Sequence, residues 1–538
     1  MRIIRMTIAA ATVLGGSIVN VAAPARGQSW DVPVLNDPMS LDAPTAADKP
    51  VQSLSIQPEL IESPPAEFHP DVPLPSRNPH WSDTTPQPIA PESIGSGVPA
   101  PPPVVTPDSK QSTKPDVKTI WAPVYPEPAP SLIQTIPSFG SAIAQRYYAD
   151  YDNGFRIRPF DPQTDVFDLK INGWIQFRHG GYSSNVDTFT DATGTTRLVE
   201  DRNAFEVERG RLIFSGHAVD RRLSYFLQFD GDTDGENQID LLDYHLQWQT
   251  DDWGQFRLGR QKLPGSRSWL ISPLDTRLTS RSLATNFFRP GRTAGVQYSV
   301  DAGWLGNVTG LIGNNFRTVN VPGGATDDKF TYTLGHVYEP LGDFGSKLID
   351  FGSSDGLKIR FGQTYTFAPQ NDARLEEPDD DEDFIRLADG TRLNDPSALV
   401  SGVTVASFDV SLYTIDFAAK YRGWSMDTEG YFRRLGNLAS DGQLPVTEVD
   451  QLGFYVQTGV FLVDRRWDVN VRFAEAHDSF GTGNEMAIGT NWFPTADERL
   501  RVTFDVAEID SSPVTATAAN ILVGDDGTVF RSQLEAQF

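Results

Sequence analysis

The sequence predicts an all-β protein: a transmembrane antiparallel β-barrel of about sixteen strands, preceded by a proline-rich disordered linker. The first observation behind this prediction is an alternation of apolar and polar residues, which begins near Phe167 and recurs to the C-terminus. In Leu500–Val506, for example, Leu, Val, Phe and Val alternate with Arg, Thr and Asp. A strand places such alternate residues on opposite faces of its sheet. The last residues, 530–538, repeat the pattern and end on an aromatic side chain.

The second observation is that the connections between these segments alternate between short and long. We expect short turns near residues 220–221, 251–252, 301–302, 341–345, 422–423, 464–465 and 495–497. We expect long, polar connections near residues 180–202, 231–238, 262–291, 313–328, 368–406, 436–449, 477–483 and 510–526. A meander with every second loop long is typical of outer-membrane barrels, which have periplasmic turns at one end and external loops at the other. A soluble sandwich with Greek-key crossings would not keep that order.

Composition excludes several other classes of protein. The chain has 538 residues, a formal net charge of −26, a mean hydropathy of −0.34 and no cysteine. No segment after residue 30 approaches the ~20 consecutive apolar residues of a spanning helix. The acidic balance argues against nucleic acid as a partner. An envelope protein that is stabilised by a closed sheet does not need disulfides.

The N-terminal region predicts export and a three-part organisation. Arg2 and Arg5 precede an apolar run that reaches Val21, and small residues follow it, so residues 1–27 are interpreted as a cleaved signal peptide. About 25 of the 39 prolines fall between residues 33 and 137. Proline at this density disfavours helices and sheets, which predicts a disordered periplasmic linker over residues 28–146. The linker is either a spacer without a partner or a tether to the cell wall. Residues 147–538 are assigned to the barrel.

The stretch from Gly259 to Val296 contains an insert of roughly 30 residues, far longer than a hairpin needs. Apolar residues such as Trp269 and Phe287 predict that it packs, and we interpret it as a loop folded into the barrel lumen. Its cations would narrow the pore and make it attractive to anions, because guanidinium groups bind carboxylate and phosphate with a fork of donors. The alternative for each cation is an ion pair that braces the wall. The candidate constriction and anion-binding residues are Arg209, Arg211, Arg257, Lys262, Arg267, Arg277, Arg281, Arg289 and Arg292.

Several segments resemble the phosphate-selective porin O/P family. They are Glu208–Leu212, Tyr225–Asp230, Gly259–Pro264 and Pro290–Val296, within a resemblance that covers about residues 150–538. The resemblance implies a sixteen-stranded, homotrimeric outer-membrane channel with an anion-binding constriction. The chain departs from the family pattern at Trp174, where the family carries arginine.

The predicted function is passive diffusion of small hydrophilic solutes, with a preference for anions, across the outer membrane. The predicted partners are membrane lipid and small anions. Seven histidines and no cysteine offer few metal ligands, so we predict no catalytic residue, metal or cofactor. The alternative is a structural envelope barrel that anchors the outer membrane to the cell wall through its proline-rich arm. Seven acids in residues 376–383 would repel multivalent anions at the mouth, which argues against phosphate specificity.

Overall fold

The computed structural model describes residues 146–231, 239–251, 254–314, 316–317, 329–370 and 385–538. The predicted signal peptide lies outside the described residues, and so does the linker up to residue 145. The acidic run 376–383 lies outside them too. Within the described part of the chain, no helix is long and apolar enough to cross a membrane.

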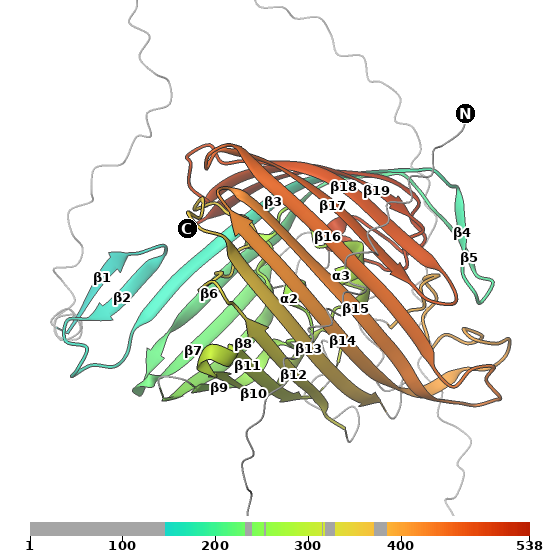
Figure 1. The fold of residues 1–538 in the computed structure, drawn as a ribbon, viewed down its shortest axis with the longest axis horizontal. Coiled ribbons are helices and arrows are strands. Elements are labelled where there is room, and N and C mark those ends of the chain that lie inside the picture. Colours follow the sequence, from blue (N-terminus) through green and yellow to red (C-terminus); the bar gives the residue numbers. More distant parts are fainter. Residues whose placement is uncertain (1–145, 232–238, 252–253, 315, 318–328, 371–384) are drawn as a thin grey trace, which may run out of the picture. The chain divides into compact units, whose positions relative to one another are not determined.

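Sixteen antiparallel strands in the described residues form a closed barrel (Figure 1). Each pairs with the next along the chain, and the last pairs with the first, so Phe530 lies opposite Gly181. Closure pairs the backbone groups that an open edge would leave exposed to lipid. The prediction of about sixteen strands is confirmed. The strands are β3 (Leu169–Ser184), β6 (Arg202–Ala218), β7 (Asp220–Gly231), β8 (Ile239–Asp251), β9 (Gly254–Lys262), β10 (Arg292–Asp301), β11 (Asn307–Gly313), β12 (Thr331–Tyr338), β13 (Lys358–Gln370), β14 (Val405–Tyr421), β15 (Trp424–Ser440), β16 (Val449–Val463), β17 (Trp467–His477), β18 (Thr482–Trp492), β19 (Leu500–Asp510) and β20 (Gly527–Gln537).

The two faces of the strands have opposite chemistry. On β19, Arg501 and Asp505 are each 3% exposed, whereas Phe504 is 52% exposed. The charged side chains therefore point into the barrel and the apolar ones point outward, the reverse of a water-soluble protein. An outward apolar band suits lipid, and a polar interior suits a water-filled channel.

Two short hairpins extend this barrel. β1 (Tyr147–Tyr151) pairs with β2 (Phe155–Pro159), and β2 pairs with the first residues of β3. β20 pairs with β3 only from Trp174 onward, so β2 continues the sheet where β20 ends. The second hairpin, β4 (Thr188–Thr190) and β5 (Thr196–Leu198), belongs to the connection between β3 and β6.

The predicted alternation of short and long connections is present, with two corrections. The connection predicted to be long near residues 477–483 is short, because only residues 478–481 separate β17 from β18. At the turn between β14 and β15, Arg422 and Gly423 have φ values of 49° and 80°, as a two-residue type I′ turn requires. The connection predicted as a short turn at residues 341–345 is wrong, because residues 339–357 all lie between β12 and β13. We call residues 339–357 the inner segment. Phe344, Leu348 and Ile349 on it are buried, so its apolar side chains find a packing partner that a tight turn would lack.

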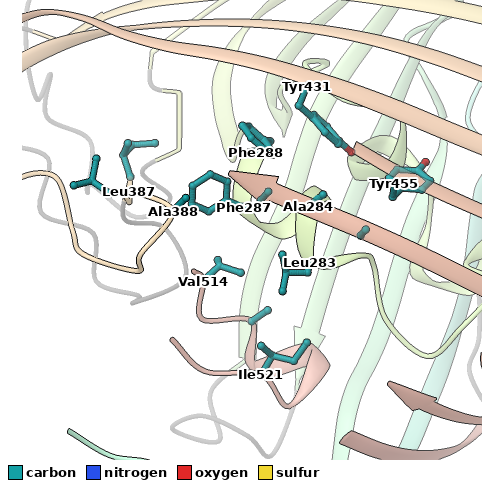
Figure 2. Close-up of a cluster of buried hydrophobic side chains, with 14 of the residues drawn as sticks. Leu283, Ala284, Phe287, Phe288, Leu387, Ala388, Tyr431, Tyr455, Val514 and Ile521 are labelled. Carbon is teal, nitrogen blue, oxygen red and sulfur yellow. The ribbon is translucent and has the colours of Figure 1, made fainter. Parts of the chain in front are cut away.

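The connection between β9 and β10, residues 263–291, folds into the barrel as predicted, and we call it the insert. It contains α2 (Arg267–Leu270), the 3-10 turn η3 (Pro273–Asp275) and α3 (Leu283–Phe288). Leu283, Phe287 and Phe288 are at most 1% exposed. They belong to an apolar cluster that includes side chains of two other long connections, among them Leu387, Val514 and Ile521 (Figure 2). Burial of such side chains contributes about 1.5–3 kcal/mol each, so the apolar anchors hold the insert inside the polar lumen.

Candidate functional site

Carboxylates of the barrel wall hold the first turns of both insert helices. The backbone N–H groups of Arg267 and Ser268 donate to Glu429 on β15, each over 3.0 Å. The N–H of Leu283, at the start of α3, donates to Glu485 on β18 over 2.7 Å. The first N–H groups of a helix have no partner within the helix and carry partial positive charge, so a buried carboxylate stabilises them.

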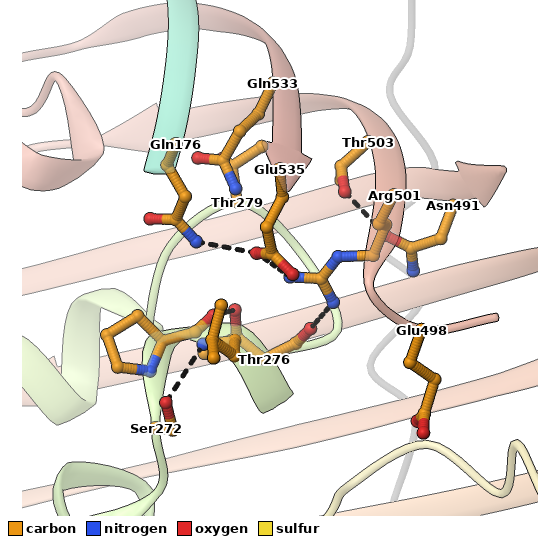
Figure 3. A network of polar contacts seen from close by, with 12 residues as sticks. Gln176, Ser272, Thr276, Thr279, Asn491, Glu498, Arg501, Thr503, Gln533 and Glu535 are labelled. Atoms are coloured by element: carbon orange, nitrogen blue, oxygen red, sulfur yellow. Dashed lines mark hydrogen bonds and ion pairs between the residues drawn. The ribbon is translucent and has the colours of Figure 1, made fainter. Parts of the chain in front are cut away.

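Arginines of the wall hold the carbonyl groups of the insert in the same way. Arg472 donates to Ser280 over 2.8 Å, and Arg433 donates to Phe287 over 2.8 Å. Arg501 lies between Glu535, at 2.8 Å, and the carbonyl of Thr276, at 2.9 Å (Figure 3). These side chains are at most 3% exposed. Much of the charge on the inner wall therefore fixes the insert rather than facing a solute path.

Four cationic side chains of the insert region surround one indole ring. The Trp269 side chain donates to the carbonyl of Gly291 over 3.1 Å. Attraction between cations and an indole face is about 0.5–2 kcal/mol, which favours this gathering of like charges. The charged groups lie 4.5–5.4 Å from the ring centroid and belong to Lys262, Arg281, Arg289 and Arg292.

Carboxylates neutralise only part of this cluster. Arg292 pairs with Asp243 over 3.0 Å. Lys262 donates to the carbonyl of Trp269 over 2.7 Å, and Arg281 donates to the carbonyls of Ser268 and Ile271 over 2.9 and 2.7 Å. Among the described residues, no carboxylate lies within ion-pair distance of Lys262 or Arg281. The insert therefore carries a surplus of fixed positive charge beside Trp269.

The remaining candidate residues have different surroundings. Arg209 pairs with Glu208 and Arg211 pairs with Asp230, each over 2.8 Å. Arg277 is 1% exposed and binds Asp427, Ser425 and the carbonyl of Leu348. Arg277 therefore connects the insert to the barrel wall and to the inner segment. The cavity described next is lined by four of the nine candidates, namely Arg211, Arg257, Lys262 and Arg267.

A cavity of about 740 Å³ lies between the insert and the wall formed by β6 to β14. Its lining includes His217 near the end of β6, Asn307 at the start of β11 and Arg360 near the start of β13. These positions adjoin the short connections, so the cavity opens on the short-turn side of the insert. Its three acidic side chains each have an arginine partner: Asp168 with Arg156 at 3.2 Å, Asp243 with Arg292 at 3.0 Å and Asp416 with Arg360 at 3.3 Å.

The sequence model of the phosphate-selective porin O and P family matches residues 182–538. The chain belongs to this family. It is therefore a porin, an outer-membrane channel. A search of curated proteins found no match.

Several solved structures are similar to this chain at low sequence identity. OmpT of Vibrio cholerae is 11% identical, over 70% of this chain and 98% of its own, with a TM-score of 0.41. The anion-selective porin of Comamonas acidovorans is 13% identical, over 69% and 99%, with a TM-score of 0.44. OprB of Pseudomonas putida is 11% identical, over 69% and 94%, with a TM-score of 0.43. The fold of this porin is argued from its own closed ring of strands.

Two features of the porin interior were not predicted from the sequence. The inner segment contributes Phe344, whose carbonyl accepts from Lys420 over 3.2 Å and whose ring lies 5.2 Å from the guanidinium of Arg267. The apolar residues Phe344, Leu348 and Ile349 within an assumed turn were the available signal. Trp174 on β3 is 3% exposed, and the centroid of its ring lies 5.0 Å from the guanidinium of Arg211.

Proposed function

We propose that this porin is a passive diffusion channel that prefers small anions. The observation that carries the proposal is the surplus positive charge beside Trp269, where Lys262 and Arg281 donate only to backbone carbonyls among the described residues. Fixed cations inside a narrow, low-dielectric wall raise the local concentration of anions and lower that of cations. The charges that brace the wall are paired, so they contribute little to this field.

Planar bilayers with the reconstituted full-length porin test the proposal. With potassium chloride at different concentrations on the two sides, we expect stepwise conductance and a reversal potential displaced toward the chloride equilibrium potential. The displacement should shrink as salt is raised, because the Debye length falls from ~10 Å at 0.1 M to ~3 Å at 1 M. A reversal potential of zero, or one displaced toward potassium, would reject anion preference.

We expect inorganic phosphate to be a weak blocker of chloride current. The seven acids of residues 376–383 follow β13 in the sequence and lie outside the described residues. Their field should repel a divalent anion more strongly than chloride. Deleting residues 376–383 should therefore strengthen the phosphate block at low salt, and the difference should vanish at 1 M salt. Block of the intact porin by micromolar phosphate would restore phosphate selectivity.

We also propose the homotrimer that the family resemblance implies. Sedimentation of the detergent-solubilised porin measures its oligomeric state and tests this proposal. The structural-anchor alternative depends on the proline-rich arm, which lies outside the described residues. A channel without measurable conductance, with an arm that binds isolated cell wall, would favour that alternative.

A further inference from the structure

Glutamine side chains from four neighbouring strands line the cavity on the short-turn side of the insert. They are Gln228 on β7, Gln247 on β8, Gln261 on β9 and Gln297 on β10. Arg257 lies directly between two of them, because it is paired in register with Gln247 on one side and Gln297 on the other. This wall therefore presents neutral amides around one guanidinium group.

The cavity also gathers hydrogen-bond donors that have no partner within the described part of the chain. They include Nη1 and Nη2 of Arg267, Nε of Arg257 and the amide nitrogens of Gln228 and Gln261. Arg267, Gln228 and Gln261 are 7%, 8% and 2% exposed. A buried donor without a partner costs about 1–3 kcal/mol, so a cluster of them indicates a ligand or ordered water.

These unpartnered atoms are all of one element. Every unpartnered buried side-chain atom among the described residues that line the cavity is a nitrogen. The Gln261 amide is oriented by Arg257, whose Nη1 donates to its oxygen over 3.4 Å. A guanidinium group can only donate, so it keeps the amide oxygen toward itself and leaves the amide nitrogen for a ligand. A solute rich in acceptor oxygens would satisfy the donors among these atoms.

We propose that this cavity is a binding site for a small hydroxylated monocarboxylate, such as a sugar acid. The proposal rests on the anion preference proposed above and narrows it to a class of solute. Arg257 and Arg267 supply charged donors for the carboxylate, and Gln228 and Gln261 supply neutral donors for hydroxyl oxygens. The ring of Phe226, stacked on His245 at 5.1 Å, adds an apolar surface for the carbon chain.

Charge and volume favour this class over the alternatives. A neutral sugar would leave Arg257 without an anion, whereas Arg267 lies 3.8 Å from the carboxylate of Asp416. A multivalent anion would meet the carboxylates of Asp168, Asp243 and Asp416. Three of the seven cations that line the cavity, Arg156, Arg211 and Arg360, are already paired with carboxylates. The volume of about 740 Å³ falls within the ~300–1,000 Å³ range of small-molecule sites.

Isothermal titration of the detergent-folded porin with D-gluconate tests the proposal. Hexanoate is the control for the hydroxyl groups, because it has the same charge and carbon number as D-gluconate but no hydroxyl groups. D-glucose is the control for the charge, because it is neutral. We expect D-gluconate to bind at least roughly tenfold more tightly than either, since its hydroxyl groups accept hydrogen bonds that hexanoate cannot accept and its carboxylate pairs with the guanidinium groups, which D-glucose cannot do. Equal affinity for D-gluconate and hexanoate would overturn the proposal and leave general anion preference intact.

Substitutions within the cavity locate the site. Gln228→Leu and Gln261→Leu should each weaken D-gluconate binding roughly three- to tenfold without weakening hexanoate binding. Gln261→Glu should abolish gluconate binding and still fold, because the new carboxylate can pair with Arg257. Gln363→Leu is the matched control, because Gln363 is exposed on the outer face of β13. If Gln363→Leu weakens D-gluconate binding as much as the cavity variants do, the binding site is not this cavity.

Bilayer recording separates this proposal from the proposed function. D-gluconate should reduce chloride current through the wild-type porin and have a weaker effect on Gln261→Leu. A porin that conducts chloride selectively but binds D-gluconate no better than hexanoate rejects the site alone. A porin without anion preference rejects the proposed function, whatever the titration shows.

Discussion

Glu485→Ala should destabilise the porin by about 3–5 kcal/mol, the usual cost of removing one partner from a buried ion pair. Glu485 is 1% exposed and accepts from Arg472 over 3.1 Å and from the backbone N–H of Leu283 over 2.7 Å. The substitution leaves a buried guanidinium without its carboxylate and the start of α3 without its acceptor. Urea unfolding of the folded porin in lipid vesicles measures the loss.

Two comparisons make this result specific. The exposed pair of Arg434 and Asp450 has a short ion-pair contact of 2.6 Å, yet Asp450→Ala should leave the urea midpoint nearly unchanged, because solvent screens the pair. The double variant Arg472→Met with Glu485→Leu removes both charges and should recover much of the lost stability. If Glu485→Ala unfolds at the same urea concentration as the wild type, the wall does not hold the insert through this pair.

The same substitution should change the open channel. Without Glu485, α3 keeps its apolar contacts through Phe287 and Phe288 but loses its link to β18. We therefore expect larger current fluctuations at constant voltage rather than loss of conductance. Unchanged fluctuations in a destabilised variant would mean that the apolar cluster alone positions α3.

The parts of this structure that follow local rules could be predicted from the sequence. Period-two alternation places Arg501 and Asp505 inside and Phe504 outside because it depends only on strand geometry. The insert is recognisable because its length and apolar content exceed the needs of a hairpin. The inner segment was missed because a turn signal near Leu341 does not reveal how many residues follow before the next strand.

The roles of individual cations could not be predicted, because they depend on contacts between residues far apart in the chain. Arg277 and Arg281 are four positions apart in the insert, yet Arg277 pairs with Asp427 of β15, whereas Arg281 donates to carbonyl groups of the insert and lies beside the Trp269 ring. Arg292 looked equivalent to Arg281 in the sequence but pairs with Asp243. Neutralising Arg292 would leave Asp243 without that partner, so Lys262 is the better companion to Arg281 in a test of selectivity.

The double variant Lys262→Gln with Arg281→Gln should strongly lower the ratio of chloride to potassium permeability. A unit charge at about 4 Å in water contributes about 1 kcal/mol, so each neutralisation should lower the ratio roughly fivefold at low salt. Neither cation has a carboxylate partner among the described residues, so the change removes positive charge without exposing a buried acid. The reversal potential in a potassium chloride gradient measures the ratio.

Arg434→Gln removes one positive charge, half the number that the double variant removes, from a position 54% exposed and paired with Asp450. It should leave the reversal potential unchanged. Equal shifts in this control and in the double variant would indicate an effect of net charge on the whole molecule. No shift in the double variant would mean that Lys262 and Arg281 only hold the turn around Trp269, to whose backbone and ring they already bind. If the surplus charge beside Trp269 selects anions, the reversal potential should shift in the double variant and not in the control. Screening should make this shift smaller at 1 M salt.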